Sequence, residues 1–231
     1  MSMLSRPTLD RRVVAEFLGS ALLTAIVIGS GIAAQQLSPT DVGLQLLENT
    51  LITGAGLFAL ISLFGPISGA HFNPVVTLAD VYFRGTDWRD LFFYVPSQIA
   101  GCISGALLAN FIFALPVISW SQHHRINGPH FVSEIVATAG LLLVIFGLNR
   151  SGKADITPAG VAAYITAAYF FTSSTSFANP AITIGRMFSN TFAGIAPSSA
   201  PGFIGAQLLG LALALGLVSY LWPSKSSAES K

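Results

Sequence analysis

Two Asn-Pro motifs stand inside apolar stretches of the chain, where both residue types are normally avoided. The first is Asn73-Pro74-Val75 and the second is Asn179-Pro180-Ala181. The carboxamide NH2 group of each asparagine can donate hydrogen bonds to a passing oxygen atom without bringing a formal charge. Asparagine is also a favoured N-cap and proline a favoured first helical residue, so each motif predicts the start of a helix.

The helices that these motifs predict are short, because helix-compatible sequence follows only over residues 76–82 and 182–189. A helix of roughly ten residues spans about 15 Å, which is half of a hydrocarbon core about 30 Å thick. Each helix N-terminus carries a partial positive charge of about half an elementary unit. Two half-helices that start inside a membrane therefore indicate a transport site that favours neutral hydroxylated solutes over cations and protons.

The composition indicates a membrane protein and argues against several other classes. Of 231 residues, 52% are hydrophobic and 9% are charged, whereas soluble domains have about 25% charged residues. The net charge is only +1 and no basic patch is present, so we expect no nucleic-acid partner. The lone Cys102 rules out an internal disulfide and a cysteine metal cluster. We expect no metal and no other cofactor.

Six membrane spans are predicted, and the basic residues orient them. If the N-terminus lies inside the cell, nine of the eleven Lys and Arg residues fall in cytoplasmic segments, and only Arg125 and Arg186 face outward. Cytoplasmic loops of membrane proteins are enriched in such residues. We therefore expect a multi-pass protein of the cell (inner or plasma) membrane with both termini cytoplasmic. The spans are expected near 12–34, 44–65, 91–116, 131–149, 157–177 and 202–222.

The chain also repeats itself within one predicted domain, residues 1–222, which a short polar cytoplasmic tail follows at 223–231. The first repeat covers about 11–116 and the second about 130–222. Glu16 near the start of the first span corresponds to Glu134 near the start of the fourth, and the two Asn-Pro motifs correspond likewise. Each repeat holds three spans, an odd number, so the second copy must be inverted in the membrane.

These residues carry a family resemblance that extends over about residues 11–222. The run SGAHFNPVVTLA, from Ser68 to Ala79, resembles the first pore loop of the aquaporin (major intrinsic protein) family. The resemblance implies an all-α membrane protein with six transmembrane helices and two re-entrant half-helices in an inverted repeat. It also implies a passive channel, a homotetramer in the lipid bilayer with one pore per subunit, and a pore midplane at the two Asn-Pro motifs.

Three ionisable residues have alternative roles. Glu16 and Glu134 are either proton-relay carboxylates or acceptors for the unpaired amides of the non-helical pore loops, and the resemblance favours loop support. His71 either lines the pore, as the family position that it resembles does, or packs within the loop. The cluster of His123, His124 and His130 lacks the ligand spacing of a metal site, so we expect it to be a solvated loop.

The resemblance places a selectivity filter at four positions counted from the two asparagines: Thr53, Ala167, Ser176 and Ile182. The fourth position is usually arginine in the family, but Ile182 occupies it here. Arg186 stands one helical turn further on and matches no filter position, so we expect it at the outer rim. The alternative, that Arg186 replaces the missing charge, stays open.

Small, uncharged filter residues predict a pore wide enough for solutes larger than water. Two hydroxyls, of Thr53 and Ser176, would face the apolar Ala167 and Ile182. This lining suits water, glycerol-type polyols and neutral metalloid hydroxides such as arsenous acid (arsenite). A channel with ion or proton leak is the main alternative, because the filter arginine is missing, and a secondary transporter is a weaker one. We see no nucleophile-base pair or metal-ligand set in the spans, so we do not expect an enzyme.

Overall fold

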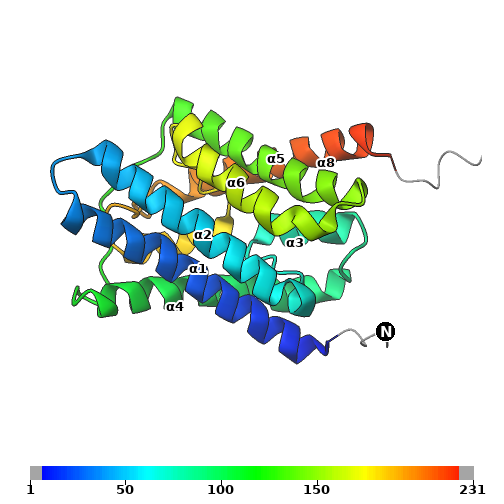
Figure 1. Ribbon diagram of the computed structural model, residues 1–231, viewed down its shortest axis with the longest axis horizontal. Coiled ribbons are helices and arrows are strands. Elements are labelled where there is room, and N and C mark those ends of the chain that lie inside the picture. The colour runs from blue at the N-terminus through cyan, green and yellow to red at the C-terminus, as the bar shows by residue number, and fades with distance from the viewer. Residues whose placement is uncertain (1–6, 224–231) are drawn as a thin grey trace, which may run out of the picture.

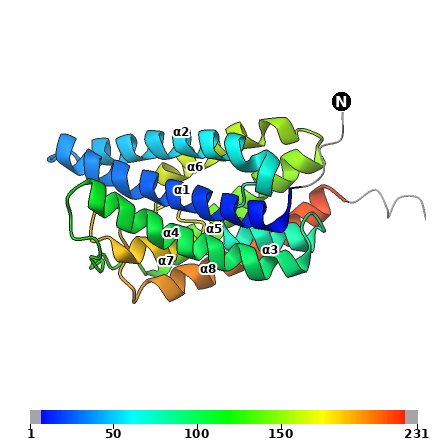
Figure 2. The same cartoon turned by 90° about the horizontal axis from the view of Figure 1, so that it is seen from below.

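The computed structural model describes residues 7–223, in which every regular element is a helix. Six long helices lie with their axes roughly aligned along the molecule (Figures 1 and 2). The first helix begins and the last one ends at the same end of the molecule (Figure 1), which we call the termini side. The long helices are α1 (Leu9–Leu37), α2 (Val42–Ser68), α4 (Leu91–Ile112), α5 (Gly128–Arg150), α6 (Thr157–Phe171) and α8 (Ala200–Leu221).

Five of these helices are long and apolar enough to cross a membrane: α1, α2, α4 joined to the short η1 (Trp88–Asp90), α5 and α8. The sixth, α6, has 15 residues and follows a short 3-10 helix, η2 (Ala154–Ile156). The predicted span 157–177 is therefore too long, because Thr172 leaves helical geometry with a ψ of 136°. The span predicted at 91–116 also ends early, at Ile112.

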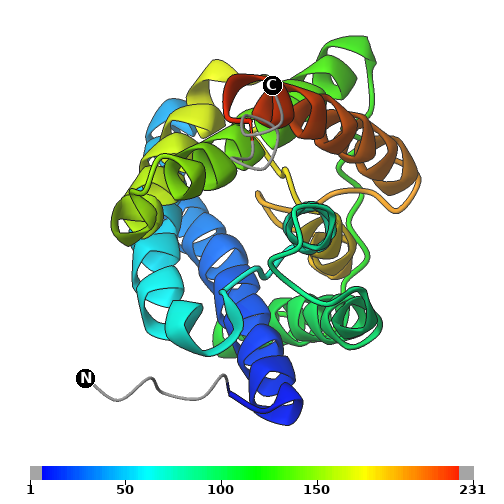
Figure 3. The ribbon, with the colours of Figure 1, turned by 90° about the vertical axis from the view of Figure 1, so that its right-hand side faces the viewer.

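Two short helices lie inside the ring of long ones (Figure 3): α3 (Pro74–Tyr82) and α7 (Pro180–Gly185), which continues as the 3-10 helix η3 (Arg186–Phe188). Both begin as the Asn-Pro motifs predict. The Asn73 Oδ1 atom accepts a hydrogen bond from the Val75 amide at 3.1 Å. The Asn179 Oδ1 atom accepts from the amides of Ala181 and Ile182 at 2.9 and 3.2 Å. The predicted N-caps are confirmed.

Glycines let the long helices of each half cross closely. A Cβ atom added to Gly101 of α4 would lie 2.4 Å from the carbonyl oxygen of Phe17 in α1. A Cβ atom added to Gly210 of α8 would lie 2.7 Å from the carbonyl oxygen of Ile135 in α5. No side chain fits at such distances, and small residues are how membrane helices reach close contact. The two crossings bring the glutamate of each half close to its pore loop.

Candidate functional site

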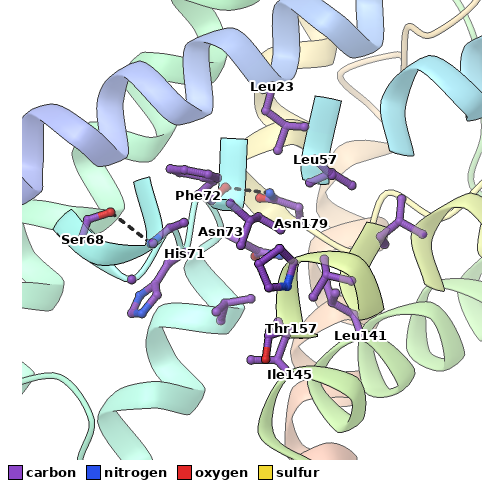
Figure 4. A pocket seen from close by; sticks show the side chains of 18 of the residues that line it. Leu23, Leu57, Ser68, His71, Phe72, Asn73, Leu141, Ile145, Thr157 and Asn179 are labelled. Atoms are coloured by element: carbon purple, nitrogen blue, oxygen red, sulfur yellow. Dashed lines mark hydrogen bonds between the residues drawn. The ribbon is translucent and has the colours of Figure 1, made fainter. Parts of the chain in front are cut away.

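One cavity of about 920 Å³ extends through the ring of helices. Asp80 and Asn149 border it on the termini side, where α3 and α5 end, and Ser176 borders it toward the opposite side. Asn73 and Asn179 border the middle, and their labelled side chains lie close together in Figure 4. The cavity thus extends from the termini side past both Asn-Pro motifs to the residues around Ser176.

The two asparagines tie the two pore loops together. The Nδ2 atom of Asn73 donates to the carbonyl oxygen of Ala178 at 2.8 Å, and the Nδ2 atom of Asn179 donates to that of Phe72 at 2.8 Å (dashed in Figure 4). A carboxamide nitrogen has two protons to donate. Each of these nitrogens uses one proton on the opposite loop, and a second remains for an oxygen atom in the cavity.

Glu16 holds the first pore loop. One of its carboxylate oxygens accepts from the Ser68 hydroxyl at 2.6 Å and the His71 amide at 3.0 Å. The other accepts from the Phe72 amide and the Gln98 side chain, both at 2.7 Å. The carboxylate is fully buried, and these four donors stabilise its charge in an apolar surrounding.

Glu134 holds the second pore loop with the same kinds of donor. The Ser174 hydroxyl donates at 2.7 Å, the amides of Phe177 and Ala178 at 2.9 Å, and the Gln207 side chain at 2.7 Å. Neither Glu134 nor Glu16 is among the residues that border the cavity. This is the geometry of loop support, and both carboxylates are buried away from the cavity.

The pore loops turn their carbonyl groups away from the glutamates. Ala70, Phe72, Ser176 and Ala178 all have φ near +50°, an uncommon left-handed backbone. Within residues 7–223, the carbonyl oxygens of 69–71 and 175–177 accept no hydrogen bond. In a membrane, unpaired backbone groups are tolerated where they line a water-filled cavity, and most of these residues border this one.

The other wall of the cavity is largely apolar. It consists of side chains from α1, α2, α5 and α6, among them Leu23, Leu57, Leu141, Ile145 and Ile165; the first four are labelled in Figure 4. A molecule in the cavity therefore meets hydrogen-bonding groups on one side and hydrocarbon on the other.

His71 borders the cavity between the midplane and the termini side, as its sequence position predicts. Its Nδ1 atom is 3.1 Å from the Thr77 hydroxyl, and its Nε2 atom is 3.7 Å from the Asp80 carboxylate. The ring also packs edge-on against Tyr94, with the ring centroids 5.5 Å apart. These contacts hold the imidazole at the wall of the cavity.

Three of the four predicted filter residues border the cavity: Thr53, Ser176 and Ile182. The placement of Ala167 is wrong, because Ala167 is exposed on the outer surface of α6. Its neighbour Tyr169 takes the place at the cavity wall, and the Tyr169 hydroxyl donates to the Thr53 hydroxyl at 3.4 Å. Two residues along a helix are a rotation of about 200°, so Ala167 and Tyr169 point in nearly opposite directions.

Arg186 lies beyond the filter, on the side away from the termini, where it is buried at the cavity wall rather than exposed. Its side chain is only 2% exposed, and Arg186 borders the same cavity as Ser176 and Ile182. The Nε atom donates to the carbonyl oxygen of Ala193, and the guanidinium carbon lies 3.4 Å from the centroid of the Phe177 ring. A cation is therefore present at the wall of the cavity beyond the filter.

The histidines of the loop between the repeats lie apart from the cavity. The His123 carbonyl accepts from the Ala196 amide at 2.8 Å, and the His124 ring is 3.2 Å from the Ser198 hydroxyl. Burial lowers the pKa of His123, with a further contribution from the charge of Arg125. Within the described part of the chain, no group of three or more His, Cys, Asp and Glu residues could hold a metal ion.

Comparison with known proteins decides the family. The sequence model described as major intrinsic protein matches residues 3–177. The chain belongs to the major intrinsic protein family. Over 213 residues it is 47% identical to the aquaglyceroporin AqpS of Rhizobium meliloti, a match that covers 92% of this chain and 91% of AqpS. It is 33% identical to a glycerol uptake facilitator protein of Pseudomonas aeruginosa over 64% of this chain and 60% of that protein.

A solved structure supports the fold of this major intrinsic protein. The aquaglyceroporin from Plasmodium falciparum superposes with a TM-score of 0.71 at 18% sequence identity, and the match covers 96% of this chain and 98% of that one. The predicted all-α, aquaporin-like architecture is confirmed. The protein is a multi-pass membrane channel rather than an enzyme.

In this major intrinsic protein, helical spacing held the signal for Tyr169, which the sequence prediction missed, and for Arg186, whose role it left open. Tyr169 follows Val161 and Ile165 at intervals of four, and residues so spaced share one face of a helix. Arg186 follows Ile182 at the same interval on the second half-helix. Following the face of each helix, rather than counting residues from Asn179, would have placed both side chains at the cavity.

The support of the pore loops leads to a stability prediction. In Glu134→Gln, an NH2 group replaces one acceptor oxygen and faces the donors of the loop. The free energy of unfolding of the protein should therefore fall by about 2–4 kcal/mol. We expect the midpoint of thermal unfolding in detergent to fall by roughly 5–15 °C. The exposed Asp10 provides the control, because Asp10→Asn should leave the midpoint nearly unchanged. Equal midpoints for parent and Glu134→Gln would contradict the supporting role.

Proposed function

We propose that the protein conducts water, glycerol-type polyols and neutral metalloid hydroxides passively through this cavity. The observation that carries the proposal is the pairing of a row of free carbonyl oxygens with an apolar wall, joined at the midplane by Asn73 and Asn179. The names of two relatives, an aquaglyceroporin and a glycerol uptake facilitator, support the same class of solute.

A polyol matches both walls of the cavity. Its hydroxyl groups donate to the carbonyl oxygens of the pore loops and accept from the second carboxamide protons of Asn73 and Asn179. Its CH groups face the leucine and isoleucine side chains of the opposite wall. Because each hydrogen bond to water is replaced as the solute advances, a neutral hydroxylated molecule crosses without a large desolvation cost.

The filter region extends this match. The Ser176 hydroxyl is buried and has no hydrogen-bond partner within residues 7–223, which leaves it free to bind a solute oxygen. Ile182 faces the same space as an apolar side chain. Arsenous acid is neutral and carries three hydroxyl groups, as glycerol does, so the same lining suits it.

A coupled transporter is disfavoured, because Glu16 and Glu134 use their carboxylates on the pore loops and do not border the cavity. A channel with proton or ion leak remains the second candidate. The observation that favours it is Ile182 at the position where the family usually has arginine.

The proposal is tested by light-scattering measurements on proteoliposomes challenged in parallel with water, glycerol, urea and arsenite gradients. We expect glycerol and arsenite to enter protein-containing vesicles several-fold faster than empty ones. Uptake should stop when the concentrations inside and outside are equal. Accumulation against a gradient would instead support a transporter, and equal glycerol and arsenite rates with and without protein would reject the proposal.

We further propose a homotetramer in the cell membrane with both termini in the cytoplasm. The family resemblance supports the tetramer, and the distribution of Lys and Arg supports the orientation. The start of α1 and the end of α8 lie at one end of the molecule, which agrees with an even number of crossings (Figure 1). Labelling of terminal tags on intact cells tests the orientation, and labelling at either end would contradict it.

A further inference from the structure

Arg186 is a buried cation on the wall of the proposed conducting path. The residue is 2% exposed and borders the cavity together with Tyr169, Ser176 and Ile182. An ionisable side chain within a membrane domain is costly and is retained for a function by default. The established architecture explains Glu16 and Glu134 as supports of the pore loops, but it gives no role to this arginine.

The position of Arg186 follows from helix geometry. Asn179 begins α7, and Ile182 and Arg186 lie four residues apart where α7 continues into η3. Residues at this interval share a face, so the face that brings Ile182 to the cavity brings Arg186 there as well. The cation lies about one turn beyond Ile182, on the side away from the termini.

The charge of Arg186 is held in place but is not neutralised nearby. Its Nε atom donates to the carbonyl oxygen of Ala193, and its guanidinium packs over the ring of Phe177. Within residues 7–223 the two terminal nitrogens have no hydrogen-bond partner, and no carboxylate oxygen lies within ion-pair distance. A buried guanidinium with free donors needs water or solute oxygen, and the adjoining cavity is where these can reach it.

A second arginine reinforces the positive field on this side of the molecule. The guanidinium of Arg125 lies 5.5 Å from the centroid of the same Phe177 ring. Arg125 donates from Nε to the Gly194 carbonyl at 2.6 Å and from a terminal nitrogen to the Phe192 carbonyl at 2.8 Å. Unlike Arg186, it is not among the residues that border the cavity. Arg125 therefore braces the loop that Arg186 also contacts, without reaching the path itself.

We propose that Arg186 is the selectivity residue that excludes protons and other cations from this pore. The inference rests on the proposed conduction through the cavity. It separates two tasks at neighbouring points along the path: Thr53, Tyr169, Ser176 and Ile182 shape the lumen for larger solutes, and Arg186 supplies the charge one turn away. Its free donors also bind a solute oxygen next to the unpaired Ser176 hydroxyl.

The test measures proton and potassium leak across proteoliposomes with a pH-sensitive dye, alongside glycerol uptake by light scattering. In Arg186→Gln we expect the leak to rise about tenfold or more, since a unit charge a few ångströms from the path strongly opposes a passing cation. Arg186→Lys keeps the charge and should keep the leak low. The double variant Ile182→Arg with Arg186→Gln restores a cation one turn away and should suppress the leak again.

Arg125→Gln is the matched control, because it removes a partly buried arginine that contacts the same ring and the same loop but not the cavity. We expect its leak to stay near the parental value. A parental leak in Arg186→Gln would overturn the inference, and so would equal leaks in Arg186→Gln and Arg125→Gln, which would indicate loop disruption. Absence of glycerol uptake by the parent would instead overturn the proposed function.

Discussion

Ile182→Arg is expected to lower glycerol and arsenite flux several-fold while reducing water permeation less. Ile182 is 6% exposed and borders the cavity beside Thr53 and Ser176. An arginine side chain from this position extends into the lumen and removes the width that a three-carbon polyol needs. It also places a second positive charge four residues before Arg186, so the new guanidinium is repelled from Arg186 and driven further across the path.

Two further variants separate size from charge. Thr53→Phe narrows the same region from α2 without a charge, so it should lower glycerol flux but leave proton leak unchanged. Ala167→Leu adds bulk on the outer surface of α6 and should leave selectivity as in the parent. Stopped-flow light scattering with glycerol and water gives both rates. Unaltered selectivity in Ile182→Arg and Thr53→Phe would mean that the filter lies elsewhere.

Asn179→Asp should raise cation conductance and lower the flux of neutral solutes. The aspartate can still cap α7, because it keeps the oxygen that accepts from the Ala181 and Ile182 amides. It cannot donate to the Phe72 carbonyl, as the Asn179 nitrogen does at 2.8 Å. A negative charge then stands where the two half-helix N-termini oppose cations, and the link between the pore loops becomes a repulsion.

Planar-bilayer conductance and glycerol uptake measured on the same preparation test this result, and Asn73→Asp should behave alike. Asn127→Asp is the control. Asn127 is also an N-cap, with its Oδ1 atom 2.8 Å from the His130 amide, but it is exposed at the start of α5. Parental conductance and parental uptake in both Asn73→Asp and Asn179→Asp would show that these asparagines do not face the conducting path.

The features that follow from local chemistry could be predicted from the sequence. The Asn-Pro caps depend on neighbouring residues only, and α3 and α7 begin where Pro74 and Pro180 indicate. The pairing of Glu16 with the first loop and Glu134 with the second spans longer distances. It could be predicted because buried glutamates and unpaired loop amides each require a partner in a membrane.

The misplacement of Ala167 has its physical origin in the second pore loop. The filter position in α6 was found by counting twelve residues back from Asn179. This count assumes a particular fold for the chain between Ala167 and Asn179. Here α6 ends at Phe171, and Thr175, Ser176 and Ala178 adopt left-handed backbone geometry. The loop thus sets how α6 is rotated, and Tyr169 faces the cavity in place of Ala167. Such backbone geometry for non-glycine residues has no dependable signature in a single sequence.

The hydrogen bonds between the two pore loops have a consequence for biogenesis. During synthesis the Phe72 carbonyl is made 107 residues before its donor, Asn179, and Asn73 is made 105 residues before its acceptor, Ala178. The first half of the chain therefore enters the membrane with a pore loop whose Phe72 carbonyl and Asn73 carboxamide nitrogen do not yet have the partners they bind in the folded protein. Translocon, lipid headgroups or water must shelter that loop until the last third of the polypeptide arrives, so the channel is completed late and as a whole rather than one half at a time.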